Sequence, residues 1–156
     1  MLARMVLMMK YIFILFILIL SANHIKAKLP VVKYCSSICT TKTLVNGNHC
    51  LYIDKRELYY RVLGKGKPTI VFVSGTGFPA QGWFQSGIAT ALSKKTRVFA
   101  YDRLYTFNSC MNHNNFMPNT AKDVVERLRK LLIKAKIKPP YILVGHSFGG
   151  LYSLLY

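Results

Sequence analysis

The chain has 156 residues, 52% of them hydrophobic, which is enough apolar material for the core of one domain and excludes an intrinsically disordered chain. Its net charge is +17, from 22 lysines and arginines against five acidic residues. Such a charge favours an anionic partner, for example an envelope surface. Because the lysines are scattered along the sequence without a basic-aromatic recognition pattern, we expect no nucleic-acid binding and no dedicated partner for them.

The N-terminal residues have the pattern of an export signal. Arg4 and Lys10 precede an uninterrupted apolar run at 11–20. Ten residues are typical of a signal peptide and short for a membrane span, which needs about twenty. We therefore predict a signal peptide at 1–27 and an exported protein, either periplasmic or secreted. The alternative is a membrane anchor at 5–22.

A polar extension at 28–48 follows the signal and contains two of the four cysteines. An even number of cysteines in an exported chain indicates one or two disulfides, and the spacing leaves their pairing open. A zinc site is the alternative, but its ligand spacing would be irregular and the compartment is oxidising. We expect neither a metal nor another cofactor. The residues concerned are Cys35, Cys39, Cys50 and Cys110 for disulfides, and Cys35, Cys39, His49 and Cys50 for zinc.

Residues 49–156 alternate between strand and helix patterns and are predicted to form one domain. The first two strands form a hairpin, and the later strands alternate with helices, so the sheet is expected to be parallel from residue 69 onward. Strands are predicted at 49–53, 57–63, 69–73, 97–101 and 141–144, helices at 83–93 and 120–137, a turn at 54–56 and a long loop at 102–117.

The helix at 120–137 has the clearest boundaries. Thr120 and Asp123 form a capping-box pattern at its start, and Pro139-Pro140 ends it. Its apolar residues recur at helical spacing and are predicted to face the core; they are Val124, Val125, Leu128, Leu131, Leu132 and Ala135.

The strand at 141–144 runs directly into the sequence Gly-His-Ser-Phe-Gly at 145–149, and a new apolar run follows. A Gly-x-Ser-x-Gly sequence between a strand and a helix is typical of a nucleophile elbow, in which the serine occupies a sharp and strained turn. The pattern predicts that the hydroxyl of Ser147 is exposed at the carboxyl end of the sheet. The glycine-rich loop at 74–79, which follows the buried strand 69–73, is predicted to offer backbone N–H groups to an oxyanion.

Together these motifs resemble the α/β-hydrolase superfamily, over residues 50–156. Four stretches carry the resemblance, in the family's order: the strand region 61–73, the loop 74–77, the strand at 98–103 that ends in Tyr-Asp-Arg, and 119–150. The resemblance implies an α/β fold, in which an N-terminal hairpin leads into a mostly parallel sheet with flanking helices. The part of the fold present here ends just after the nucleophile elbow.

The resemblance also implies roles for particular residues. Ser147 would be the nucleophile that attacks a carboxylic ester or another small acyl substrate, and the backbone N–H groups of Phe148 and Thr76 would form the oxyanion hole. His146 would be a packed or surface residue. Many members have glycines where this chain has Tyr105 and Phe107, so we expect the loop after the Tyr-Asp-Arg sequence to take another path.

The acid and the histidine of the family's triad follow the serine in chain order, whereas only residues 151–156 follow the elbow here. We therefore expect the chain to be the N-terminal half of a hydrolase, from a fragment, a frameshift or a decayed gene. Negligible turnover is expected, because a serine without a base is a poor nucleophile and His113 is an unpromising substitute. The strand at 141–144 should be an exposed edge.

Two other functions remain open from the sequence. One is a non-catalytic, basic envelope protein that binds anionic surfaces. The other is a half-domain that is completed by a separately encoded C-terminal piece.

Overall fold

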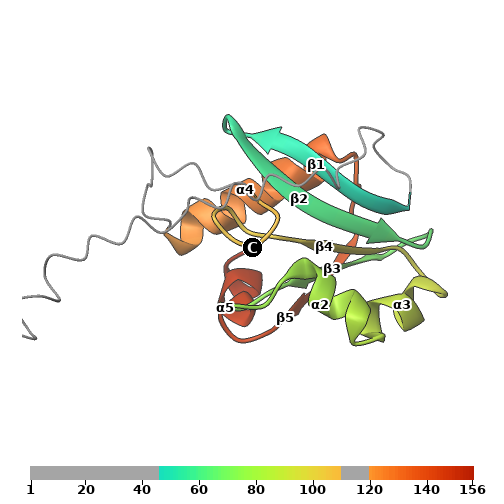
Figure 1. The fold of residues 1–156 in the computed structure, drawn as a ribbon. Coiled ribbons are helices and arrows are strands. Elements are labelled where there is room, and N and C mark those ends of the chain that lie inside the picture. The colour runs from blue at the N-terminus through green and yellow to red at the C-terminus, as the bar shows by residue number, and fades with distance from the viewer. Residues whose placement is uncertain (1–45, 110–119) are drawn as a thin grey trace, which may run out of the picture. The chain divides into compact units, whose positions relative to one another are not determined.

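A computed structural model describes residues 46–109 and 120–156, which form a five-stranded mixed sheet with helices on both faces (Figure 1). The order of the strands across the sheet is β1-β2-β4-β3-β5. The strands are β1 (Gly47–Ile53), β2 (Arg56–Leu63), β3 (Thr69–Val73), β4 (Val98–Tyr101) and β5 (Tyr141–Gly145). The helices are α2 (Ala80–Gln85), α3 (Ile88–Ser93), α4 (Ala121–Lys134) and α5 (Phe148–Leu155).

The β1–β2 hairpin is tighter than the sequence suggested. Arg56, predicted as part of the turn, pairs with Ile53, so the turn consists of Asp54 and Lys55 alone. Their φ angles are 50° and 62°, because a two-residue hairpin turn of the favoured hand needs positive φ at both positions.

The parallel part of the sheet is built on β3, which pairs with β4 on one side and β5 on the other. All five residues of β3 are buried, as expected for a strand covered on both faces. β2 joins β4 in the antiparallel direction. Among the described strands β5 pairs with β3 alone, and Ile142 is 48% exposed, so the predicted exposed edge is confirmed within this part of the chain.

Each face of the sheet has its own apolar core. α4 and α5 cover one face, where Leu128, Leu131 and Tyr152 pack on side chains of the strands. α2 and α3 cover the other face, where Trp83, Phe84 and Ala89 pack against Phe72 and Ala100. The sheet is therefore a layer between two layers of helix (Figure 1).

α4 begins as the sequence predicted. The N–H of Asp123 donates to Thr120 Oγ1 (3.2 Å), and the N–H of Thr120 donates to Asp123 Oδ2 (2.9 Å), which completes the capping box. All six residues predicted to face the core are buried. The helix ends at Lys134 rather than at residue 137, since Lys136 takes a positive φ of 58°.

The single helix predicted at 83–93 is wrong. The structure has two short helices there, α2 and α3, because Gly87 adopts a left-handed φ of 81° and interrupts the helical backbone between them. α2 also starts at Ala80, three residues earlier than predicted. Apolar residues lie on both sides of Ser86 and Gly87, so the sequence pattern did not reveal that the helix is interrupted there.

Several predictions fall outside the described residues: the signal peptide at 1–27, most of the extension at 28–48, Cys35, Cys39, Cys110 and His113. Cys50 in β1 is disulfide-bonded, which favours the disulfide prediction over the zinc site for this residue. Over 46–109 and 120–156, none of the helices is both long enough and apolar enough to cross a bilayer.

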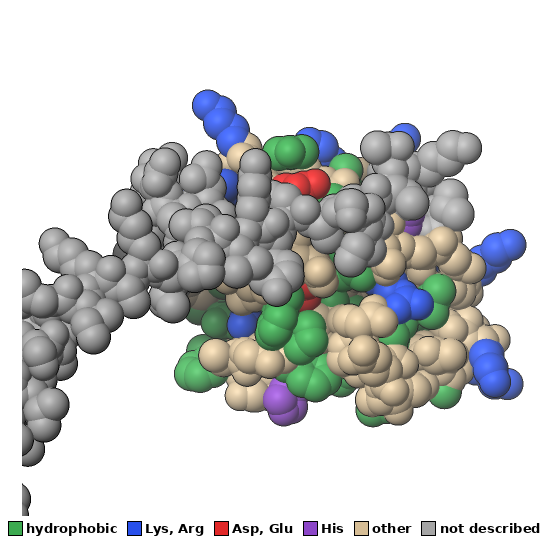
Figure 2. Space-filling view, in the orientation of Figure 1, with side chains coloured by type: hydrophobic (Ala, Val, Ile, Leu, Met, Phe, Trp, Pro, Cys, Tyr) green, Lys and Arg blue, Asp and Glu red, His purple; other side chains and the backbone are tan. Residues whose placement is uncertain are grey.

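The surface is unevenly charged. On the face shown in Figure 2, Lys and Arg side chains project from the periphery, whereas acidic side chains cover little of the area. Only two ion pairs join the described side chains, Arg129 with Glu126 and Lys130 with Asp54. Six of the described lysines are exposed and take part in neither pair: Lys65, Lys67, Lys94, Lys95, Lys136 and Lys138.

Candidate active site

Ser147 lies at the turn between β5 and α5, with φ 54° and ψ −129°. A non-glycine residue in this region of backbone space is strained, and such strain is concentrated at functional sites. Hydrogen bonds from Gly149 N to His146 O and from Gly150 N to Ser147 O, both 2.8 Å long, close the turn. The serine is exposed, and its hydroxyl makes no hydrogen bond to the described residues.

The glycines on either side of the serine allow the helix to cross the sheet closely. A Cβ atom at Gly149 would lie 1.9 Å from Val73 O, and one at Gly145 would lie 2.6 Å from the backbone of Gly149. Both contacts are with backbone atoms, which cannot move aside as a flexible side chain would. The two glycines of the Gly-x-Ser-x-Gly sequence are therefore required by packing here, independently of any chemistry.

The loop that follows β3 lies directly against this turn. His146 N donates to Val73 O (3.1 Å), and a Cβ atom at Gly75 would lie 2.7 Å from Ser147 Cβ. Thr76, the next residue, is exposed beside the serine. Neither the N–H of Thr76 nor that of Phe148 donates to an acceptor among the described residues. The structure thus brings the three residues singled out from the sequence to one end of the sheet.

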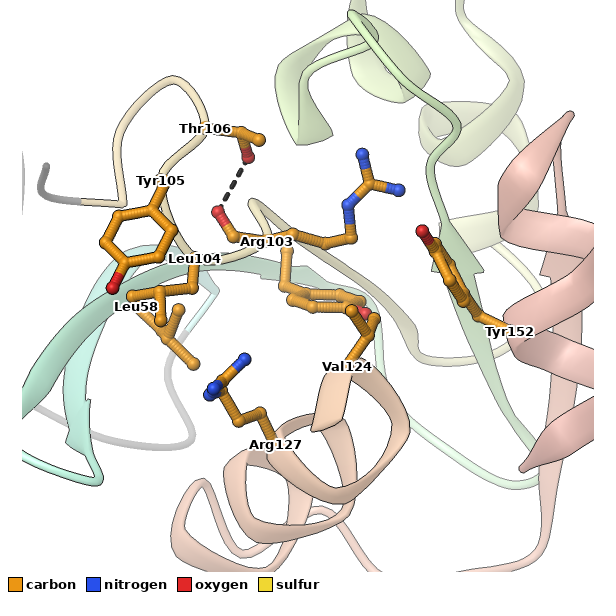
Figure 3. Close-up of a pocket in the computed structure, with 9 residues that line it drawn as sticks. Leu58, Arg103, Leu104, Tyr105, Thr106, Val124, Arg127 and Tyr152 are labelled. Atoms are coloured by element: carbon orange, nitrogen blue, oxygen red, sulfur yellow. Dashed lines mark hydrogen bonds between the residues drawn. The ribbon is translucent and has the colours of Figure 1, made fainter. Parts of the chain in front are cut away.

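Two side chains hold this loop in place. Trp83 Nε1 donates to Ser74 Oγ (2.9 Å), and the Arg103 guanidinium donates to the carbonyl oxygens of Ser74 (2.7 Å) and Gly75 (3.1 Å). The same guanidinium lies 5.2 Å from the ring centroid of Tyr152 in α5. Figure 3 shows the two side chains facing each other. Arg103 therefore ties the loop after β3 to the helix after the serine.

The buried carboxylate of Asp102 holds two segments next to this loop, the start of α2 and the loop after β4. The residue is 1% exposed, and its carboxylate accepts hydrogen bonds from Ala80 N (2.7 Å) and from the backbone and side-chain nitrogens of Asn108 (both 3.0 Å). Burial raises the pKa of Asp102, and these hydrogen bonds only partly offset it. Since both oxygens are occupied by structural donors, the carboxylate fixes the start of α2 and the loop after β4.

The loop after β4 contains two residues in an unusual conformation. Tyr105 and Phe107, for which the family resemblance predicted a path other than that of members with glycines, take φ angles of 65° and 45°. These are left-handed conformations that glycine adopts easily and other residues adopt at a cost of about 1–3 kcal/mol. The different path remains a prediction.

Neither of the two described histidines hydrogen-bonds to the serine hydroxyl. His146 is exposed, and its ring packs 5.5 Å from that of Phe78 and 6.4 Å from that of Trp83, which matches the expected packed or surface histidine. His49 is buried in β1 and stacks on Tyr60 at 5.0 Å. β1 and β5 are the opposite edges of the sheet, about 19 Å apart at the usual strand spacing.

A cavity of about 240 Å³ lies on the α4 and α5 side of this region, between Tyr101, Arg103, Val124, Arg127 and Tyr152 (Figure 3). Ser147 does not line it. The hydroxyl of Tyr101 is buried and has no hydrogen-bond partner among the described residues, and burial raises its pKa. The cavity is thus separate from the turn that carries the serine.

Sequence reasoning did not find Arg103, Asp102 or Trp83 as supports of the site. The Tyr-Asp-Arg sequence at 101–103 was visible as a motif, but its hydrogen bonds join residues more than twenty positions apart. Such long-range contacts have no local sequence pattern.

Comparison with known proteins shows the family to which the chain belongs. The model of the alpha/beta hydrolase family matches residues 70–156. The chain is 33% identical over 102 residues to the uncharacterized protein YbdG of Bacillus subtilis, a match that covers 65% of this chain and 30% of the relative. It is 31% identical over 93 residues to YqjL of the same organism, with 60% and 35% covered. The chain thus spans about a third of these curated relatives.

Solved structures share the fold. An alpha/beta hydrolase fold protein from Burkholderia ambifaria aligns with a TM-score of 0.58 and 28% identity, over 74% of this chain and 40% of that one. The epoxide hydrolase VrEH1 from Vigna radiata aligns with a TM-score of 0.57 and 17% identity, over 68% and 33%. The described sheet and helices correspond to a part of that fold.

Proposed function

Because the chain belongs to the alpha/beta hydrolase family, we propose that Ser147 is the nucleophile of a serine hydrolase that acts on a carboxylic ester or another small acyl compound. The observation that supports this most is the strained backbone of Ser147, φ 54° and ψ −129°, on an exposed turn between a strand and a helix. This geometry presents a hydroxyl to solvent at the carboxyl end of the sheet.

The proposal gives the neighbouring backbone a role. Ser147 Oγ adds to the acyl carbonyl as its hydroxyl proton passes to a base, and the leaving group departs with that proton as an alcohol. Water then hydrolyses the acyl-serine, which releases the acid and restores the Ser147 hydroxyl. The N–H groups of Phe148 and Thr76 have no acceptor among the described residues, so they are available to stabilise the oxyanion of the adduct. Loss of one such donor costs about 100- to 1000-fold in kcat.

We also propose that the 156-residue polypeptide has negligible turnover by itself. Neither described histidine hydrogen-bonds to the Ser147 hydroxyl: His146 packs against aromatic rings, and His49 lies at the far edge of the sheet. A serine hydroxyl without a base is a weak nucleophile. Export of the protein is part of the same proposal and rests on the sequence of 1–27 alone.

A cysteine substitution separates the turn geometry from the need for a base, since a thiol is a few per cent ionised at neutral pH and is intrinsically reactive. Ser147→Cys and the exposed control Ser86→Cys are incubated with p-nitrophenyl acetate, and acylation of each cysteine is followed by peptide mass spectrometry. We expect Ser147→Cys to acylate at least about tenfold faster, because the oxyanion donors assist only at the elbow.

Equal acylation rates at the two positions would count against Ser147 as the nucleophile. Wild-type protein is treated in parallel with a fluorophosphonate probe. Rapid labelling that Ser147→Ala abolishes would retain the nucleophile but show that the proposed lack of turnover is wrong.

A further inference from the structure

The amino-terminal ends of β3, β4 and β5 lie together at the end of the sheet opposite Ser147, because these strands are parallel. The connections that lead into them are bonded to one another. Thr96 Oγ1 donates to Pro68 O (2.5 Å), Ile70 N donates to Arg97 O (2.9 Å), and Thr69 N donates to Pro140 O (3.0 Å). Three segments distant in the sequence thus form one continuous surface.

Every charged side chain on these three connections is basic. We call this surface the basic edge; it consists of Lys65, Lys67, Lys94, Lys95, Arg97, Lys136 and Lys138. All except Arg97 are exposed, and none of the seven takes part in the ion pairs of the described residues. Figure 2 shows basic side chains projecting on the right-hand side, where β3 and β4 begin in Figure 1.

The five acidic residues lie elsewhere. Asp54 and Glu57 are at the β1–β2 turn and Asp102 follows β4, which places them toward the Ser147 end of the strands. Asp123 and Glu126 are in the first half of α4, whose start lies beside the same end. Six of the ten lysines in the described residues are therefore gathered by the topology at one end of the sheet, where no acidic residue lies.

We propose that the basic edge binds an anionic phospholipid surface. Each Lys or Arg held near an anionic leaflet strengthens binding about fivefold, so seven on one surface give strong, salt-sensitive adsorption. The three connections contain no aromatic residue on which a base could stack, which disfavours single-stranded nucleic acid as the ligand.

The described part of the chain also begins at this end of the sheet. Gly47, the first residue of β1, pairs with Val62, next to the pair that Leu63 makes with the first residue of β4. The first described residues of the chain therefore lie at the basic edge. Adsorption through this edge leaves Ser147 about 16 Å away, at the far end of the five-residue strands, and facing solution.

Charge reversal at matched positions tests the proposal. The full chain is sedimented with vesicles of phosphatidylcholine, with and without phosphatidylglycerol, at low and physiological ionic strength. The pair Lys94→Glu and Lys95→Glu is compared with Lys55→Glu and Lys122→Glu, which change the net charge equally at the opposite end of the strands. Circular dichroism verifies that each variant is folded.

We expect the basic-edge pair to lower the affinity gained from phosphatidylglycerol at least about tenfold, and the distal pair to lower it less than about threefold, since its charges lie beyond the screening length of about 10 Å. Hydrogen exchange at 64–68 and 94–97 should slow on vesicle binding, and exchange at 74–79 should not. Equal losses for the two pairs, binding independent of phosphatidylglycerol, or tighter binding to duplex DNA than to vesicles would each overturn the proposal.

Discussion

The two ends of the parallel strands are built in different ways. At the carboxyl end, Ser74, Asp102 and Ser109 are buried and hydrogen-bonded, and the backbone approaches itself so closely that Gly75 and Gly149 have no room for a side chain. At the amino end, Gly64 also lacks room for a side chain, but the short connections carry exposed lysines that take part in no ion pair of the described residues. Buried, hydrogen-bonded polar groups thus gather where chemistry is proposed, and positive charge without acidic neighbours gathers where a surface contact is proposed.

This difference shows that a polar residue can serve two unlike purposes in one small domain. The buried carboxylate of Asp102 fixes backbone and is costly to disturb, because each hydrogen bond that it accepts would leave an unpaired donor. The lysines of the basic edge contribute little to folding and are free to serve binding. Three substitutions test this contrast.

The largest effect is expected for Gly149→Ala. The added Cβ would lie 1.9 Å from Val73 O, and neither the strand nor the helix can shift without opening the core, so the free energy of unfolding should fall by more than about 3 kcal/mol. Urea denaturation followed by circular dichroism measures this. Gly150→Ala is the control, since its Cβ meets nothing within 4 Å and alanine favours a helix. Similar stability of the two variants would contradict the crossing geometry.

A smaller loss, about 2 kcal/mol at neutral pH, is expected for Asp102→Asn. The asparagine amide has one oxygen in place of two, so it can accept hydrogen bonds at only one of the two positions. Its NH₂ group would face the N–H donors of either Ala80 or Asn108. The exposed Asp54→Asn, which loses only the surface ion pair with Lys130, should cost less than about 1 kcal/mol.

The pH dependence of stability distinguishes the buried carboxyl further. Burial raises the pKa of Asp102 in the folded state above its ordinary value of 3.8. Between pH 3.8 and the raised pKa, the folded protein therefore binds more protons than the unfolded protein. The proton-linked stabilisation by this residue, which is separate from its hydrogen bonds to Ala80 and Asn108, is thus fully present below pH 3.8 and is lost as the pH rises through the raised pKa. This component should be missing from the denaturation profile of Asp102→Asn, and its persistence there would assign it to another group.

The smallest effect is expected at the basic edge. The double substitution Lys94→Ala and Lys95→Ala should change the free energy of unfolding by less than about 0.5 kcal/mol, because both side chains are exposed and unpaired by acidic groups. Thr96→Ala, one residue away, should cost about 1 kcal/mol through loss of the hydrogen bond to Pro68 O. A double variant less stable than Thr96→Ala would show that the lysines support the fold.

The sequence by itself determined the elements with strong local patterns. The hairpin, the continuous apolar run of β3, the capping box at Thr120 and the Gly-x-Ser-x-Gly turn all depend on residues a few positions apart, and each appears in the structure close to its predicted place. The break at Gly87 was missed, because apolar spacing on either side of a glycine does not reveal the φ angle that the glycine adopts.

Only the tertiary structure decided what these elements bring together. Arg103 reaches the carbonyls of Ser74 and Gly75 because β3 and β4 are adjacent parallel strands, and lysines from three separate connections share one edge for the same reason. The order of strands in a sheet is set by packing between elements far apart in the chain. Local sequence patterns therefore predicted the serine turn, whereas the supports around it and the charged edge behind it emerged from the fold.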